Sequence, residues 1–163
     1  MNKQRLVGLV LAIAVVVAGK HYYRNAGADD LGWLLAPTAK MVSAVTDTHF
    51  VREAGVGYID QRVAFEIAPV CAGLNFLLAG FLALVIGWLG GMTTWRGMAR
   101  RLAVAVVAAY AATLVVNTIR IAIAIRMHAN PEVHRLEGVL VYLGGLCALY
   151  ALARRIERTH AAA

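Results

Sequence analysis

Four long stretches without a charged side chain constrain this chain more than any other feature of its 163 residues. They cover residues 6–19, 67–95, 102–119 and 138–153. A helix crosses the bilayer's hydrocarbon core, about 30 Å thick, with roughly 20 predominantly apolar residues. The composition agrees, because 61% hydrophobic and 15% charged residues leave too little polar surface for a soluble globule and too little charge for a disordered chain. We therefore predict an all-α integral membrane protein.

The predicted spans form a four-helix bundle within a single membrane domain. They cover about residues 6–23, 72–89, 102–120 and 138–153, with roughly 20 residues as the reference length. The first span also fits a cleaved signal peptide, since Lys3 and Arg5 precede the apolar run and small residues lie near Ala18. With the first span retained, four crossings bring both termini to the same side of the membrane.

The charged residues indicate which side that is. If the N-terminus is cytoplasmic, the inner segments hold eight Lys and Arg against one acid, a net charge of +7, and the outer segments hold eight basic against eight acidic side chains. Short cytoplasmic loops carry such an excess of Lys and Arg. The basic pI of about 9.9 therefore reflects topology in a cytoplasmic (inner) membrane. We expect the lipid bilayer, and no nucleic acid, as a partner.

The outer segment, residues 24–71, carries the structure between the first two spans. Residues 31–46 are uncharged apart from Lys40, which would cost about 2.5–3.5 kcal/mol in the hydrocarbon if this stretch spanned the membrane. We interpret this stretch as an interfacial or re-entrant helix broken near Pro37. Residues 56–59 and 62–67 flank a polar turn and predict a small β-hairpin. Pro69 should end the second strand.

Three reactive side chains are predicted to reach the outer interface together. Cys71 begins the second span, Arg120 ends the third, and His134 lies about one turn before the fourth. A thiolate is a nucleophile, and a neighbouring cation favours its formation. Arg120 could alternatively stabilise the oxyanion of an attacked carbonyl, and histidine transfers protons near neutral pH. This set can cleave or transfer an acyl group.

Other polar residues near these positions have supporting roles or none. Asn117 lies three residues before Arg120 on the same helical face, where it could orient Arg120 or donate to the oxyanion. His128, Glu132, His134 and Glu137 contain no HExxH pairing, so we expect neither a metal nor a cofactor. Cys147 lies within the fourth span and is interpreted as a packing residue.

Three short blocks resemble the signatures of a known family. These blocks are Cys71-Ala-Gly73-Leu-Asn75-Phe, Asn117-Thr-Ile-Arg120, and His134 with Gly138. In this order they resemble the exosortase and archaeosortase family of membrane cysteine proteases and transpeptidases, and the small size is most like the exosortase K group. Ala72 stands where many members have Ser, and four spans are fewer than in the larger members.

The resemblance implies an activity and a substrate. Family members process C-terminal sorting signals of exported proteins at the outer face of the cytoplasmic membrane. The family's catalytic residues would be Cys71, Arg120 and His134, with Gly73, Asn75 and Asn117 in support. The implied partner is an exported protein that carries a sorting signal and a transmembrane tail.

Two other classes of function compete with this prediction. A non-catalytic membrane scaffold could use Arg120 and His134 to pair with a partner or with lipid headgroups. Such a protein would leave Cys71 slow to react with thiol reagents. A small transporter would need polar residues near the middle of the bilayer, and apart from Asn75 and Asn117 near the span ends the sequence offers few.

Overall fold

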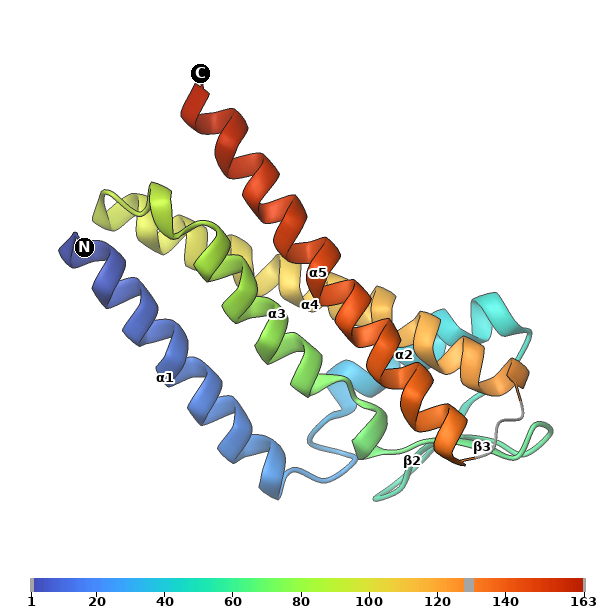
Figure 1. Cartoon of the computed structure of the whole chain (residues 1–163). Helices are drawn as coiled ribbons and strands as arrows, with labels where there is room; N and C mark the ends of the chain where they lie inside the picture. The colour runs from blue at the N-terminus through green and yellow to red at the C-terminus, as the bar shows by residue number, and fades with distance from the viewer. Residues whose placement is uncertain (1, 128–130, 163) are drawn as a thin grey trace. The chain divides into compact units, whose positions relative to one another are not determined.

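The computed structural model describes residues 2–127 and 131–162, without the side chains of residues 131–135 and 160–162. The chain is mostly helical with one small sheet (Figure 1). The helices are α1 Lys3–Asn25, α2 Gly32–Thr46, α3 Leu74–Gly87, α4 Trp95–Met127 and α5 Pro131–Ala162. The strands are β1 Val51–Glu53, β2 Gly57–Asp60 and β3 Phe65–Ile67, and the short 3-10 turns are η1 Pro69–Cys71 and η2 Leu89–Gly91.

Four helical segments are long and apolar enough to cross a membrane, as the sequence predicts. They are Lys3–Asn25, Pro69–Gly87, Trp95–Met127 and Leu136–Thr159. Helices α4 and α5 extend well past the apolar stretches, through charged residues at both ends. Helix α5 begins at Pro131, seven residues before the predicted fourth span and ahead of His134. Proline suits a first helical position, where its missing N–H is not needed.

The chain divides into two compact units, which are described separately. Unit 1 consists of Met1–Tyr22, Asn75–Ala112 and Gly144–Ala163, and unit 2 of Tyr23–Leu74 and Thr113–Leu143.

Unit 1 has a core of apolar side chains from α1, α3, α4 and α5. Its buried members include Ala12, Phe81, Leu84, Val85, Trp88, Met92, Met98, Ala105, Ala109 and Ala153. Small residues let the helices approach closely. A β-carbon at Gly87 would lie 2.9 Å from the Ala153 β-carbon, and one at Gly19 would lie 2.6 Å from Leu78 Cδ2. Ordinary helix packing therefore explains these glycines.

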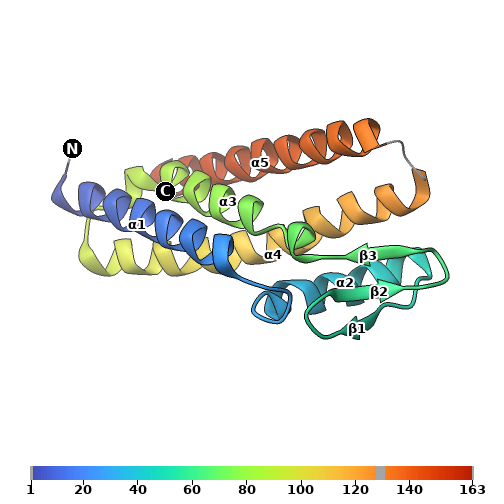
Figure 2. The same ribbon diagram turned by 90° about the horizontal axis from the view of Figure 1, so that it is seen from below.

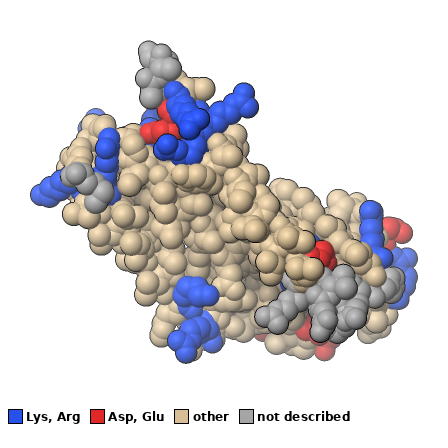
Figure 3. Space-filling model, in the orientation of Figure 1, with Lys and Arg blue, Asp and Glu red and all other residues tan. Residues whose placement is uncertain are grey.

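Polar contacts also stabilise one end of unit 1. The Trp88 indole N–H donates to the Ala153 carbonyl at 3.1 Å. Arg101 forms an ion pair with Glu157, and both side chains are largely buried. Figure 3 shows Lys and Arg side chains around the region where Figure 1 places the start of α1, the α3–α4 connection and the end of α5.

In unit 2, helix α2 is confirmed but its predicted break is wrong. It runs without interruption from Gly32 to Thr46 through Pro37. Proline removes one backbone hydrogen bond of a helix and its ring crowds the carbonyl four residues earlier, but burial of apolar side chains on both sides of it compensates. The buried residues of α2 are Leu34, Leu35, Thr38, Ala39 and Val42.

The predicted hairpin is confirmed, and a third strand extends it. Strands β2 and β3 pair antiparallel with Tyr58 opposite Ile67, and β1 pairs with the other edge of β2. Figure 2 shows the sheet beside α2, which lies against β2. No sequence pattern predicts β1, because all three of its residues are exposed and none alternates with a buried neighbour.

Two carboxylates fix the loops around the sheet. Asp60 accepts hydrogen bonds from the backbone N–H groups of His49 at 2.5 Å and Arg62 at 2.8 Å, and these lower the pKa of its carboxyl group. Asp29 accepts from the Arg52 guanidinium at 2.7 Å and from the Gly55 N–H at 3.1 Å. The Arg52 hydrogen bond is the main cause of a lowered pKa at Asp29. Both groups are therefore ionised at neutral pH.

Candidate functional site

Cys71 lies at the end of the short turn η1, immediately before α3, and is half-buried. Pro69 begins this turn, where its fixed φ angle is suitable. The Cys71 N–H donates to the Ala68 carbonyl at 2.8 Å, and the Ala72 N–H to the Pro69 carbonyl at 3.0 Å. The thiol is thus carried by a hydrogen-bonded turn.

Gly73 allows the chain to turn from η1 into α3. Its φ of +75° is in the left-handed region, which glycine adopts without steric cost. A β-carbon at this position would lie 3.1 Å from Asn117 Cγ and 3.2 Å from Thr113 Cγ2. Gly73 therefore permits both the turn and the close approach of α4.

Asn117 is fully buried and joins three parts of unit 2. Its side-chain amide N–H donates to the Cys71 carbonyl at 2.6 Å. Its amide oxygen accepts from the Tyr142 hydroxyl at 2.9 Å and from the Arg120 guanidinium at 3.5 Å. The backbone of the cysteine turn and the arginine are thereby tied to one side chain.

Arg120 is positioned from two helices. It lies one turn after Asn117 on α4, and its guanidinium donates to the Tyr142 hydroxyl of α5 at 3.2 Å. The guanidinium carbon also lies 5.2 Å from the centre of the Tyr142 ring, within range of a cation–π interaction. A β-carbon at Gly138 would lie 3.0 Å from Arg120 Nε, so the arginine packs directly on the α5 backbone.

The Cys71 thiol is within electrostatic range of this group. Arg120 interacts with it electrostatically. Tyr23 of α1 contributes a further hydroxyl, which donates to the Pro69 carbonyl at 3.2 Å and interacts with Cys71 and Tyr142. We define the Cys71 cluster as Tyr23, Cys71, Asn117, Arg120 and Tyr142.

The structure brings four of the predicted site residues together, but it places Asn75 elsewhere. Cys71, Gly73, Asn117 and Arg120 come together in unit 2. Asn75 belongs to unit 1, where it is exposed and accepts a hydrogen bond from Lys20 at 2.8 Å. His134 lies in the first turns of α5, but its side chain is outside the described residues.

Tyr142 and Tyr23 are cluster members that the sequence interpretation missed. Tyr142 had no assigned role, although its position four residues after Gly138 and eight after His134 places it on the same face of α5. That spacing could have revealed it. No sequence signal distinguishes Tyr23 from its neighbour Tyr22.

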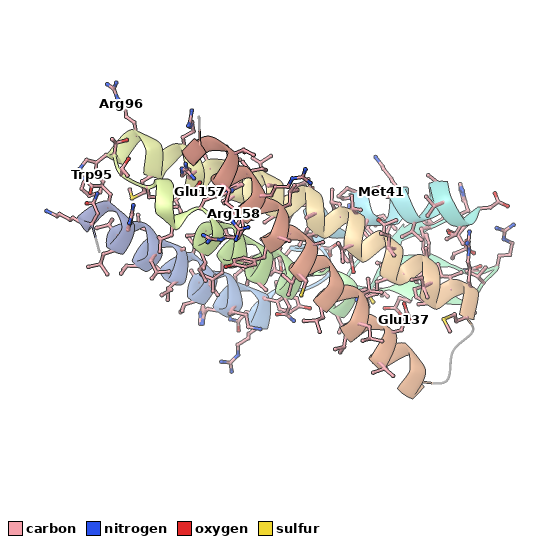
Figure 4. All side chains as sticks on the ribbon, turned by 45° about the horizontal axis from the view of Figure 1, so that its top comes forward. Met41, Trp95, Arg96, Glu137, Glu157 and Arg158 are labelled. Carbon is pink, nitrogen blue, oxygen red and sulfur yellow. The ribbon has the colours of Figure 1, made fainter. Side chains whose placement is uncertain are left out.

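Glu137 lies three residues after His134 in α5. Figure 4 labels it on the N-terminal half of this helix, and its two carboxylate oxygens are shielded from solvent. Among residues 2–127 and 131–162, as far as their side chains are described, no three His, Cys, Asp or Glu residues are grouped to hold a metal ion. The chemistry of the described site therefore consists of a thiol, a guanidinium, an amide and two phenols.

Comparison with models of known protein families, with curated proteins and with solved structures gives no match for this chain.

A pair of glycine substitutions tests whether the Cys71 turn needs its backbone conformation. Gly73→Ala should lower the free energy of unfolding by about 2 kcal/mol, because alanine is strained at positive φ and its β-carbon would press on Asn117. Gly144→Ala is the matched control in a helix, because a β-carbon there meets no atom within 4 Å. It should stabilise the protein by about 0.5–1 kcal/mol. Unfolding of the purified proteins in detergent measures both, and equal effects would refute the assignment.

Proposed function

We propose that this chain is a membrane-embedded cysteine protease or transpeptidase of the exosortase type. Its substrate is an exported protein that is cut near a C-terminal transmembrane tail. The observation that supports this most is a hydrogen-bonded link: the Asn117 side chain binds both the Cys71 carbonyl and the Arg120 guanidinium. Asn117 and Cys71 are 46 residues apart in the sequence. The two family-like blocks that carry these residues lie far apart in sequence and meet at one side chain.

In the proposed reaction, the Cys71 sulfur attacks the carbonyl carbon of the scissile peptide bond. The guanidinium of Arg120 stabilises the oxyanion that forms. The C–N bond then breaks, His134 donates a proton to the leaving amine, and the substrate is held as a thioester. An acceptor amine or water attacks the thioester, gives its proton to His134 and releases the Cys71 thiolate.

Membrane insertion is part of the proposal. The four apolar helical segments and the asymmetric distribution of Lys and Arg support a multi-pass protein with both termini in the cytoplasm. Cys71 would then face the outside of the cytoplasmic membrane. A substrate with its own transmembrane tail diffuses in the same plane and presents its cleavage site at a similar depth.

Deletion of the gene in its native host tests this function. Exported proteins that end in an apolar span and a basic tail should keep that tail in the deletion strain and lose it when the wild-type gene is restored. Mass spectrometry of C-terminal peptides from the membrane fraction measures the change. If every C-terminus is the same in both strains, the protease assignment fails and the non-catalytic scaffold becomes the better interpretation.

A further inference from the structure

The last turns of α5 carry an exposed group of three arginines that the proposed reaction does not use. Arg158 lies four residues after Arg154 and three residues after Arg155, so the three side chains lie on one face of the helix. Together with Tyr150 and Ala151 they line a surface groove of about 580 Å³. We call these three side chains the α5 arginine group.

The nearest acidic residue in sequence does not neutralise this group. Glu157 lies between Arg155 and Arg158, but it is ion-paired with Arg101 and largely buried. Figure 4 labels Glu157 and Arg158 on the C-terminal part of α5. Within the described part of the chain, none of the three arginines forms an ion pair. Three positive charges on neighbouring turns repel one another, so a bound anion would relieve this repulsion.

The surface beside the α5 arginine group is apolar. Leu152 is 56% exposed and Ile156 is 37% exposed. Of the most apolar 18 residues within Leu136–Thr159, only 6% are buried inside the protein. Tyr150, at 42% exposed, is a residue type that is enriched at the membrane–water interface. A ligand that fits this place has an anionic head next to a hydrocarbon chain.

We propose that the α5 arginine group binds the phosphate of an anionic phospholipid whose acyl chains lie along the exposed face of α5. Guanidinium groups bind phosphate through two parallel hydrogen bonds, and basic residues next to a transmembrane helix attract anionic lipids. The proposal rests on membrane insertion but not on catalysis. The Cys71→Ala variant should therefore bind lipid like the wild type. A failure of the lipid proposal can thus be distinguished from a failure of the protease proposal.

Native mass spectrometry of the purified full-length protein tests the site. The protein is titrated in detergent with phosphatidylglycerol and, separately, with phosphatidylcholine. The variant Arg154→Gln/Arg155→Gln/Arg158→Gln should bind phosphatidylglycerol at least about tenfold more weakly than the wild type, with little change for phosphatidylcholine. These side chains are exposed, so the variant should fold.

The matched control removes three other exposed charges of unit 1, in the variant Lys3→Gln/Arg96→Gln/Arg100→Gln. It should change phosphatidylglycerol binding by less than about twofold, although its net charge falls equally. An equal loss in both variants, or no loss in either, would overturn the assigned site. Displacement of the lipid by equimolar inorganic phosphate would also overturn it, because the site would then recognise free phosphate.

Discussion

Replacing Cys71 by alanine is expected to abolish cleavage of the exported substrate, with the rate falling at least about 10³-fold. Alanine has no nucleophile, so no thioester can form, and loss of a covalent nucleophile is among the most severe substitutions in an enzyme of this class. The backbone carbonyl that Asn117 binds is still present in this variant. The fold should therefore survive, and the loss should be in chemistry.

Cys147→Ala is the matched control for this substitution. Cys147 is the second free cysteine, exposed on α5 in unit 1, and its change should leave cleavage within about twofold of the wild type. Cleavage is followed in cells by the ratio of uncut to cut substrate on immunoblots, at equal levels of each variant. Normal cutting by Cys71→Ala would show that the nucleophile assignment is wrong.

Arg120 and His134 provide the companion variants. Arg120→Ala and His134→Ala should each leave uncut substrate, because one removes the stabilising charge and the other the proton carrier. Arg126→Ala is a suitable control for the first, since Arg126 is exposed and makes one long hydrogen bond to the Val45 carbonyl at 3.4 Å. His49→Ala serves the second, because the His49 contact with Asp60 is made by its backbone.

Helix number could be predicted from the sequence, but the helix ends could not. Apolar stretches set how many helices of membrane-spanning length form. A helix continues for as long as its backbone hydrogen bonds do, however, and these do not require apolar side chains. Helix α4 thus begins at Trp95, before the charged residues Arg96, Arg100 and Arg101, although the apolar stretch begins only at Leu102.

The break predicted at Pro37 was wrong, and strand β1 was not predicted, because both depend on contacts outside the local sequence. Proline is a poor helix residue on average, which predicted a break at Pro37. Five buried positions along α2 outweigh that cost. Strand β1 shows the converse, because its exposed residues carry no pattern and it exists only through its pairing with β2. Both outcomes depend on tertiary contacts that a local pattern does not contain.

The candidate site was predicted only in part, because a local sequence pattern does not contain the tertiary contacts that complete it. Unusual polar residues at the ends of apolar stretches pointed to Cys71, Asn117 and Arg120, because such groups are costly in a membrane and are retained for function. Tyr142 is an ordinary amphipathic residue in sequence. Its role becomes visible only when its hydroxyl lies between Asn117 and Arg120.

Asn117→Leu is expected to lower the free energy of unfolding by about 2–4 kcal/mol and to abolish substrate cleavage. Leucine has the same branched arrangement of heavy atoms, but it leaves the Cys71 carbonyl, the Tyr142 hydroxyl and the Arg120 guanidinium without the amide they bind. Each buried polar group that loses its partner costs about 1–3 kcal/mol, offset in part by relaxation. Unfolding in mixed micelles with increasing sodium dodecyl sulfate measures the change.

Thr118→Val is the control that separates a lost hydrogen bond from a general intolerance of substitution. Thr118 is the next residue of α4 and is also buried, at 5% exposed, but its hydroxyl makes no hydrogen bond within the described part of the protein. Valine has the same shape and removes an unsatisfied polar group, so stability should stay constant or rise by up to about 1 kcal/mol. Equal destabilisation by both variants would mean that Asn117 matters as a packing residue. A large loss confined to Asn117→Leu would instead show that its amide connects the cysteine turn to Arg120.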